Sequence, residues 1–481
     1  MTDAPGTHAP PESSWKQLFI GAGAMRCVVL TSGVVLHSLF MFITATVLPA
    51  IVADIGGVTF YAWVTTLFGI SSIAGSVLTP TVLGTLSPNR GYQVALLLFL
   101  VGSLICALAP NMAMIIVGRA LQGFGGGLMT ALATTMVPTL FSEGLRSRAL
   151  ALISSMWGPV ALLGPLVGGI FAYGGLWRGT FWLVLPVTCA LWFCGRQVLP
   201  RGWPQREDID ERVFGTQALR LTLILAAALA LSIASVTGDP LSVIAGTGLA
   251  LALGLAALRL DRYANRRLFL KGTFELNSPI GATTALMMLL VLGVGAGPFV
   301  PYILGTAHGV SAVAAGYVAA LSSLAWSLSA LLTAGVEASV SRRLIAVSPM
   351  CVLVAMLGAG WGLWLGSLWL TALSWALFGA GIGIAWPHLA SRVIAYAQPP
   401  DRALAGGFIT TLQILAGTFG AAFAGMVANL TGLGKSEASA HIAYSGLLLF
   451  VCFAVPSIVA LVASQRLLNL TATADARSKK L

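Results

Sequence analysis

The sequence predicts an all-α integral membrane protein with about fourteen transmembrane helices, and three observations lead to this fold class. Of the 481 residues, 57% are hydrophobic and only 9% are charged, with a mean hydropathy of +0.91. A soluble domain carries about 25% charged residues. Apolar runs of about 18 residues or more recur along the chain, and each can cross a hydrocarbon core of about 30 Å. Their period is helical rather than the alternation of a membrane barrel.

The apolar runs are expected to be transmembrane helices. Their approximate spans are 28–50, 60–83, 92–109, 112–140, 148–173, 178–197, 216–236, 241–260, 279–304, 309–338, 345–367, 369–396, 404–430 and 440–464. They predict an N-terminal six-helix bundle at 28–197 and a C-terminal six-helix bundle at 279–464. Residues 198–278 hold cytoplasmic linkers and two inserted helices, and 1–27 and 465–481 are cytoplasmic tails. The inserted pair is almost purely aliphatic, which favours a lipid-facing position.

The placement of positive charge predicts the orientation. With the N-terminus inside, 23 of the 26 Lys and Arg fall at cytoplasmic loops, helix ends or tails. Only Arg178 and Lys435 fall outside, and Arg119 falls inside a helix. This is the positive-inside distribution, so both termini are expected in the cytoplasm and the protein in the cell (inner or plasma) membrane. The net charge of +11 therefore reflects topology and contact with anionic lipid, and no nucleic-acid partner is expected.

The two bundles also resemble each other internally. The fourth helix carries a glycine-rich run from Arg119 to Gly127, and the twelfth carries another from Phe378 to Gly383. Each is followed by an acid-and-arginine loop and then by a helix rich in small residues. An internal repeat of this size predicts a transporter whose site lies between the repeats.

These residues resemble the major facilitator superfamily, and specifically its fourteen-helix drug:proton antiporter branch, over nearly the whole chain. Thr46 to Ile51, followed by Asp54, looks like the first-helix motif of that branch. Arg119 to Gly127 looks like its fourth-helix motif, and Gly164-Pro165-Leu166-Val167-Gly168-Gly169 looks like the core of its antiporter motif in the fifth helix. The resemblance implies a major-facilitator fold and proton-coupled transport of a small organic compound through a central cavity.

The chain departs from the branch pattern at three points. The aspartate usual early in the first helix is replaced at its register by Phe40, with His37 one turn earlier. The loop between the second and third helices has Pro88 and Asn89 before Arg90, so the usual Asp and its Arg neighbour are missing. Buried carboxylates are scarce. The chain therefore lacks the loop Asp and Arg that form the usual cytoplasmic gate, and it lacks the first-helix aspartate that is the usual proton carrier.

Ionisable groups within membrane helices are costly, so they are the first candidates for function. Arg119 cannot be neutralised, and it is expected at the central cavity, where it tunes a proton site or holds an anionic group. His37 and His388 can carry a proton near neutral pH. Tryptophans in mid-helix can stack on a planar ligand, and neighbouring amides and hydroxyls can bind it. The candidate cavity or coupling residues are His37, Arg119, Gln122, Trp157, Trp326, Trp386, His388, Thr410 and Gln413.

A second set of residues is expected to form gates or helix packing. Glycine lets helices approach closely, and proline bends them. The helix with Gly164 to Gly169 is expected to pack against 404–430 in the other bundle. Glu337 is expected either to pair with Arg342 and Arg343 at an inward gate or to carry a proton. The complete set is Arg90, Gly158, Pro159, Gly164, Pro165, Gly168, Gly169, Glu337, Arg342, Arg343, Gly417 and Gly420.

The pattern favours a secondary transporter over an enzyme. The sequence has no GxxxxGK[ST] phosphate loop, no HExxH or cysteine-pair metal pattern, and no evident Ser-His-acid set, so no cofactor or metal is expected. An apolar, aromatic cavity suits a small amphipathic compound. Proton-coupled efflux is the leading hypothesis, with a small-molecule substrate, protons and membrane lipids as partners and the monomer as the working unit. Import of a planar nutrient such as a vitamin is the alternative. A non-transporting receptor or lipid-handling protein is a third hypothesis.

Overall fold

The computed structural model describes residues 15–19, 21–142, 145–146, 148–149, 152–153, 156–202, 211–237, 240–264, 267–333, 336–397, 402–434 and 438–478. The first half contains α1 (Trp15–Leu18), α2 (Gly21–Ile55), η1 (Val58–Phe60), α3 (Tyr61–Val77), α4 (Thr79–Thr85), α5 (Pro88–Ala107), α6 (Met112–Leu140), α8 (Trp157–Tyr173) and α9 (Arg178–Val198). The inserted pair is α10 (Glu211–Thr237) and α11 (Pro240–Arg262). The second half contains α12 (Pro279–Leu292), η2 (Gly293–Ala296), α13 (Phe299–His308), α14 (Ala312–Thr333), α15 (Ala338–Leu365), α16 (Leu368–Tyr396), α17 (Arg402–Leu430) and α18 (Ser439–Ser478).

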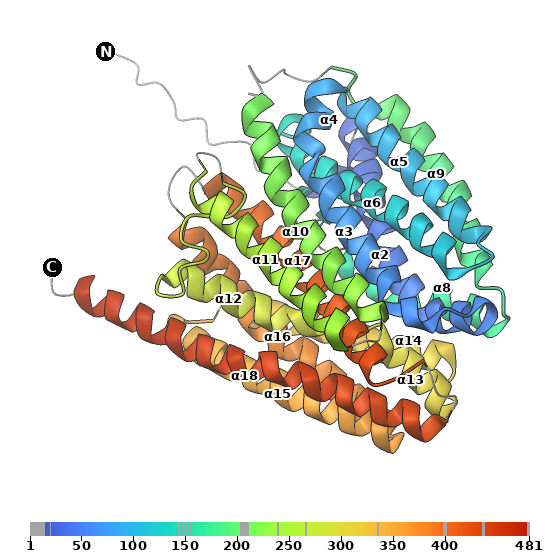
Figure 1. Cartoon of the computed structure of the whole chain (residues 1–481). Helices are drawn as coiled ribbons and strands as arrows, with labels where there is room; N and C mark the ends of the chain where they lie inside the picture. Colours follow the sequence, from blue (N-terminus) through green and yellow to red (C-terminus); the bar gives the residue numbers. More distant parts are fainter. Residues whose placement is uncertain are drawn as a thin grey trace, which may run out of the picture.

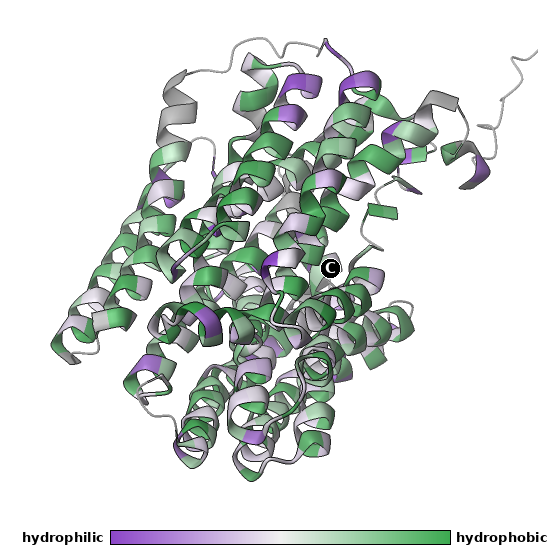
Figure 2. Ribbon diagram, turned by 90° about the vertical axis from the view of Figure 1, so that its right-hand side faces the viewer, coloured by the Kyte–Doolittle hydropathy of each residue, from purple (hydrophilic) through white to green (hydrophobic). Residues whose placement is uncertain are grey.

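The described helices confirm a multi-pass membrane fold. Thirteen spans are long and apolar enough to cross a membrane, with α12, η2 and α13 counted as the single span Pro279–His308. A shorter apolar helix at Gly158–Tyr173 completes the fourteen that the sequence predicts. In Figure 2 the helices are hydrophobic along most of their length, and hydrophilic residues gather mainly near their ends. The helical conformation satisfies the backbone groups within each span, and the polar residues lie mainly where the spans end.

Capping residues begin several of these helices. Ser87 accepts a hydrogen bond from the backbone N–H of Arg90 at the start of α5, and Asn111 accepts one from Met114 at the start of α6. Such caps satisfy donors that the helix itself cannot. The connection from α2 to α3 turns at Gly57, whose φ of 81° favours glycine. These caps and turns mark the two opposite ends of the spanning helices. We name them the Asp54 end, where α2 ends and α3 begins, and the Asn89 end, where α5 begins.

The two halves use their glycines in the same way, as the internal resemblance predicts. A Cβ at Gly123 or Gly127 on α6 would collide with the carbonyl oxygens of Phe68 and Ser72 on α3. Correspondingly, a Cβ at Gly379 on α16 would collide with the carbonyl oxygen of Ser322 on α14. Gly383, one turn later, meets Trp326 in the same way. Small residues thus bring α3 onto α6 and α14 onto α16 at backbone distance.

The expectation that the inserted pair faces lipid holds for α11, whose apolar span is only 17% buried, and is wrong for α10, whose span is 50% buried. Figure 1 shows α10 and α11 crossing the boundary between the N-terminal helices and the C-terminal helices. The indole N–H of Trp63 on α3 donates to the carbonyl oxygen of Ser232 on α10 at 3.1 Å. Ala227 and Leu231 of α10 pack with Ala422 of α17. α10 therefore contacts both halves, and its small alanines allow that close packing.

Charged groups also tie the inserted pair together. Arg220 on α10 forms a buried ion pair with Asp261 on α11, at 2.5 Å. The same carboxylate accepts the backbone N–H groups of Leu268, at 2.7 Å, and Phe269, at 3.2 Å. Phe269 in turn packs edge-on against Phe408 of α17, with ring centroids 6.0 Å apart. The segment that leaves the inserted pair is therefore anchored between α11 and α17.

Candidate functional site

The two halves meet through an aromatic contact at the Asp54 end. The phenol of Tyr61, at the start of α3, donates to the carbonyl oxygen of Pro298 in the other half at 2.8 Å. Its ring lies 5.0 Å from that of Phe299 and 4.9 Å from that of Tyr302, measured between centroids. Tyr61 is only 1% exposed, so this contact excludes solvent. One buried hydrogen bond and two ring contacts thus join the halves here.

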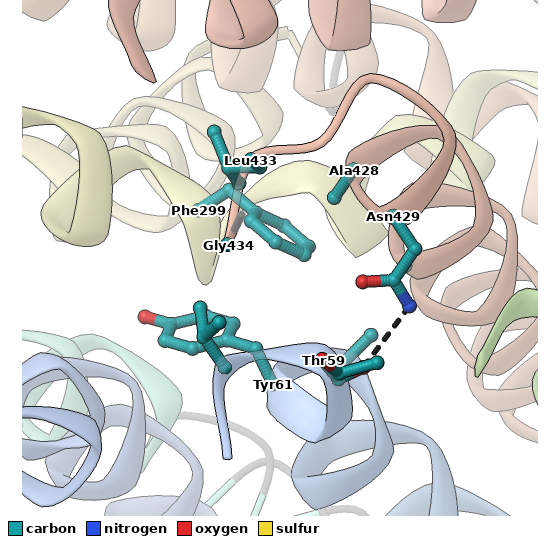
Figure 3. Close-up of a pocket in the computed structure, with 10 residues that line it drawn as sticks. Thr59, Tyr61, Phe299, Ala428, Asn429, Leu433 and Gly434 are labelled. Atoms are coloured by element: carbon teal, nitrogen blue, oxygen red, sulfur yellow. Dashed lines mark hydrogen bonds between the residues drawn. The ribbon is translucent and has the colours of Figure 1, made fainter. Parts of the chain in front are cut away.

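A second contact closes the same end. The side-chain amide of Asn429, at the end of α17, donates to the carbonyl oxygen of Thr59 at 3.0 Å, as Figure 3 shows. The space between these residues, Tyr61 and Phe299 has a cavity volume of about 10 Å³. A cavity of this size holds about one water molecule. No organic substrate can pass between the halves here without a rearrangement.

Two helix pairs carry the rest of this interface, and they correct the predicted packing. A Cβ on Gly169 of α8 would lie 2.8 Å from the Cα of Val313 on α14, and one on Gly316 would lie 3.1 Å from Pro165. α17 instead packs on α3, where Gly425 meets Ala62. The expectation that the helix of Gly164 to Gly169 packs against 404–430 is therefore wrong.

The other glycines of that run pack within the N-terminal half. A Cβ on Gly168 would lie 2.9 Å from the Cβ of Thr46 and 3.0 Å from the carbonyl oxygen of Ile43, both on α2. Gly164 likewise packs on Phe42 of α2. The antiporter-like segment therefore has two faces, one towards α2 in its own half and one towards α14 in the other half. α8 therefore packs tightly against both halves.

Three of the predicted cavity residues come together within the N-terminal half. The imidazole of His37 on α2 stacks on the ring of Phe68, with centroids 5.0 Å apart and planes 13° apart. The guanidinium carbon of Arg119 on α6 lies over the same ring, 3.8 Å from its centroid. Nη1 of Arg119 donates to Oε1 of Gln122 at 3.0 Å. All three predicted residues are buried.

The amide of Gln122 continues this cluster. Its Nε2 donates to the hydroxyl of Ser103 at 2.8 Å, and that hydroxyl donates to the carbonyl oxygen of Phe99 at 2.7 Å. Nε2 of His37 lies 3.5 Å from the hydroxyl of Ser72, at the outer limit of a hydrogen bond. Nδ1 of His37 is buried without a partner in the described structure. The cluster therefore orients Gln122 firmly and leaves hydrogen-bonding capacity at His37 and Arg119.

The C-terminal half holds a second, aromatic cluster. The rings of Trp326 on α14 and Trp386 on α16 meet edge to face, with centroids 5.2 Å apart. His388 on α16 is buried, hydrogen-bonds the backbone of Thr333 on α14, and leaves Nε2 without a partner in the described part of the chain. These residues all lie nearer the Asn89 end than the Asp54 end of their helices. They offer a flat apolar surface beside a titratable group.

The remaining predicted residues are more scattered. The side chains of Trp157 and Thr410 lie outside the described part of the structure, and Gln413 is half-buried on α17. Gly417 meets no atom within 4 Å of a Cβ, whereas Gly420 packs on Leu292 inside its own half. Gly158 likewise has open space, and Pro159 and Arg90 are exposed.

The predicted ion pair at Glu337 is not formed in this structure. Glu337 is an exposed residue just before α15, and Arg342 and Arg343 are exposed on its first turns. Within the described ranges, the side-chain ion pairs are Asp54 with Arg178 and Arg220 with Asp261. Glu337 belongs to neither of them.

Some residues of the site were not predicted from the sequence. Tyr61 lies at a helix end, where an aromatic residue is usually read as part of the interfacial belt. Phe68 carries no polar group, so only its position between His37 and Arg119 reveals it. Asp54 accepts from Arg178 at 2.6 Å and from the indole of Trp177 at 3.1 Å, bracing the Asp54 end. The distance between Asp54 and Arg178 in sequence hid this pair, although both residues flank predicted helices.

The fold and this site define a membrane transporter: two helical halves joined at one end, with polar and aromatic groups buried behind the junction. The model of the Major Facilitator Superfamily matches residues 30–258. A probable multidrug-efflux transporter of Mycobacterium tuberculosis is 31% identical over 90% of this chain and 93% of its own length. The chain belongs to the major facilitator superfamily, and it is a transporter rather than an enzyme.

Other comparisons agree with this assignment. A multidrug transporter of Bacillus subtilis is 25% identical over 80% of this chain and 72% of its own length. Among solved structures, a POT family transporter bound to a thioalcohol-conjugated peptide superposes with a TM-score of 0.66 at 15% identity. The match covers 93% of this chain and 96% of that one. This likeness shows the fold alone, and it confirms the predicted fold class.

Proposed function

We propose that the protein is a proton-coupled exporter of small amphipathic organic compounds that works by alternating access. The observation that carries this proposal is the closure at the Asp54 end, where Tyr61 joins the halves and the residual cavity holds about one water molecule. Closure at one end is one of the two states that such a transporter must adopt. The similarity to multidrug-efflux transporters over most of the chain supports the substrate class and the direction.

The distribution of Lys and Arg supports an orientation with both termini in the cytoplasm of the cell, in its inner or plasma membrane. The Asp54 end then faces outside, and the structure is the state closed to the outside. Residues 28–197 and 279–464 are the two moving halves. The helix pairs α8 with α14 and α3 with α17 form the interface that separates when the outer side opens.

His37 is the proposed proton carrier of the N-terminal half. It is buried, has a free nitrogen in the described structure, and stacks on Phe68 beside Arg119. A protonated imidazole gains from contact with an aromatic face. A substrate that displaces Phe68 removes this contact and so favours release of the proton. Binding of substrate and loss of a proton are then linked, as antiport requires.

The test uses proteoliposomes that contain a pH-sensitive dye and receive an imposed pH gradient. Ethidium, a dansylated fatty acid and Nile red are the transport probes. We expect at least one probe to move against the proton flux and His37→Gln to abolish the linkage, while the control His441→Gln keeps it. Probe movement without proton movement in the wild-type protein contradicts proton coupling. Gradient-driven transport in His37→Gln removes His37 from the mechanism.

A further inference from the structure

The internal repeat supplies a control for the role of Arg119. Arg119 lies one turn before Gly123, and Trp375 lies one turn before Gly379, the glycine that packs on α14 as Gly123 packs on α3. Nε of Arg119 faces the carbonyl oxygen of Val64 on α3 at 3.5 Å. Correspondingly, the indole N–H of Trp375 donates to the carbonyl oxygen of Ala319 on α14 at 2.9 Å. A neutral side chain thus performs the structural task that Arg119 performs.

The positive charge of Arg119 is therefore not needed for helix packing. It is also expensive, because Arg119 is 2% exposed and an uncompensated buried charge costs several kcal/mol. A guanidinium has five N–H donors. The described structure gives acceptors to Nε, at Val64, and to Nη1, at Gln122, so donors remain available. The contact with Phe68 engages the positive centre and provides no acceptor in the plane of the group.

Among the residues that the structure describes, no acidic side chain forms an ion pair with Arg119. The sequence has fifteen Asp and Glu. Of these, Asp54, Glu211, Asp261 and Asp475 lie within one turn of a helix end, and the other acidic residues lie outside the described helices. The charged or titratable neighbours that contact its surroundings are His37, across Phe68, and Cys106 of α5, whose sulfur packs against Gly118. Neither supplies a negative charge at neutral pH.

We propose that Arg119 receives the carboxylate of an amphiphilic, singly charged anionic substrate, an inference that rests on the proposed export of amphiphiles. A carboxylate matches the fork of a guanidinium with two parallel hydrogen bonds. The apolar remainder of the ligand suits the apolar helices around the cluster. A phosphate monoester requires more cations than this cluster offers, and an ammonium compound is repelled by Arg119.

The experiment measures binding without any gradient, so it is independent of proton coupling. Purified full-length protein is titrated with matched carboxylates, primary amides and amines on naphthyl, biphenyl and decyl scaffolds, and the thermal midpoint is recorded. We expect carboxylates to bind about tenfold or more tightly than the amides, as a charge-assisted pair implies. Arg119→Gln removes this preference, Arg119→Lys keeps part of it, and the control Trp375→Phe leaves it unchanged.

Two results overturn the proposal. One is that no scaffold binds better as its carboxylate than as its amide in the wild-type protein. The other is that Arg119→Gln folds and still prefers carboxylates over amides. If Arg119→Gln does not fold, the deciding result is that of Trp375→Phe, and loss of the carboxylate preference in that variant overturns the proposal. Carboxylate binding without proton-driven export in proteoliposomes supports this inference and contradicts the proposed coupling, so the two failures are distinguishable.

Discussion

His37 and Arg119 lie on the same phenyl ring, that of Phe68, although they come from α2 and α6 and the ring comes from α3. One side chain therefore links a titratable group to a permanent cation without a hydrogen bond between them. Aromatic faces attract cations, so the position of this ring affects both groups at once. A change at Phe68 should alter coupling more than folding.

Phe68→Leu tests this link because leucine keeps an apolar side chain but loses the aromatic face. We expect transport to fall about tenfold, since cation–π contacts contribute up to about 2 kcal/mol when desolvated. The measurement is the initial rate of probe movement in proteoliposomes at matched protein content. Phe423→Leu is the control, because it makes the same substitution at a ring that packs on Phe453 of the C-terminal half. Equal rates in the two variants would show that Phe68 merely fills space.

Tyr61→Phe should loosen the Asp54 end. It removes one hydrogen bond, to Pro298, and retains the ring contacts. A net loss of about 1 kcal/mol shifts the closed-to-open ratio about fivefold. Spin labels across the two halves at this end should report a larger open population by pulsed electron resonance. Tyr302→Phe keeps the bond to Pro298 and should leave the distribution as in the wild type. A distribution unchanged by Tyr61→Phe contradicts a latch at this residue.

Gly169→Leu and Gly168→Leu should fail differently, because these neighbouring residues face different helices. Leucine at Gly169 meets Val313 of α14 and should block closure between the halves. Leucine at Gly168 meets Thr46 of α2 and should destabilise the N-terminal half by about 1–3 kcal/mol. Transport and thermal midpoint are measured together, with Gly158→Leu as the control in open space. A loss of stability in Gly169→Leu as large as that in Gly168→Leu would refute the two-faced helix.

The buried pair of Arg220 and Asp261 should matter more for stability than the half-exposed pair of Asp54 and Arg178. Breaking a buried pair costs about 3–5 kcal/mol, whereas exposed pairs contribute little. Asp261→Ala also leaves the N–H groups of Leu268 and Phe269 without their acceptor. We therefore expect a clearly lower thermal midpoint in Asp261→Ala than in Asp54→Ala. Equal midpoints would mean that the inserted pair is held by packing alone.

Sequence patterns predicted the helices well because hydrophobic length and charge placement act locally on each helix. They also brought Arg119 and Gln122 together, since residues three apart share a helix face. They failed where packing depends on surface shape between distant segments. The helix of Gly164 to Gly169 was paired with its counterpart in the repeat, whereas the structure pairs α8 with α14. The aliphatic composition of α10 suggested a lipid-facing helix, but its Ala227 packs with Ala422 of α17. Small apolar residues suit both lipid and a close helix contact, so composition alone does not distinguish the two positions.

The position of α10 has a consequence for the order of assembly. Ribosomes make chains from the N-terminus, so α10 exists before α17 has been synthesised. Trp63 of α3 can then bond to Ser232 of α10 while the second half is still absent. The surface of α3 is thus partly covered during biogenesis, and α17 completes an interface that α10 has already begun. The inserted pair acts, in this respect, as an internal assembly template placed between two repeats that would otherwise meet unaided.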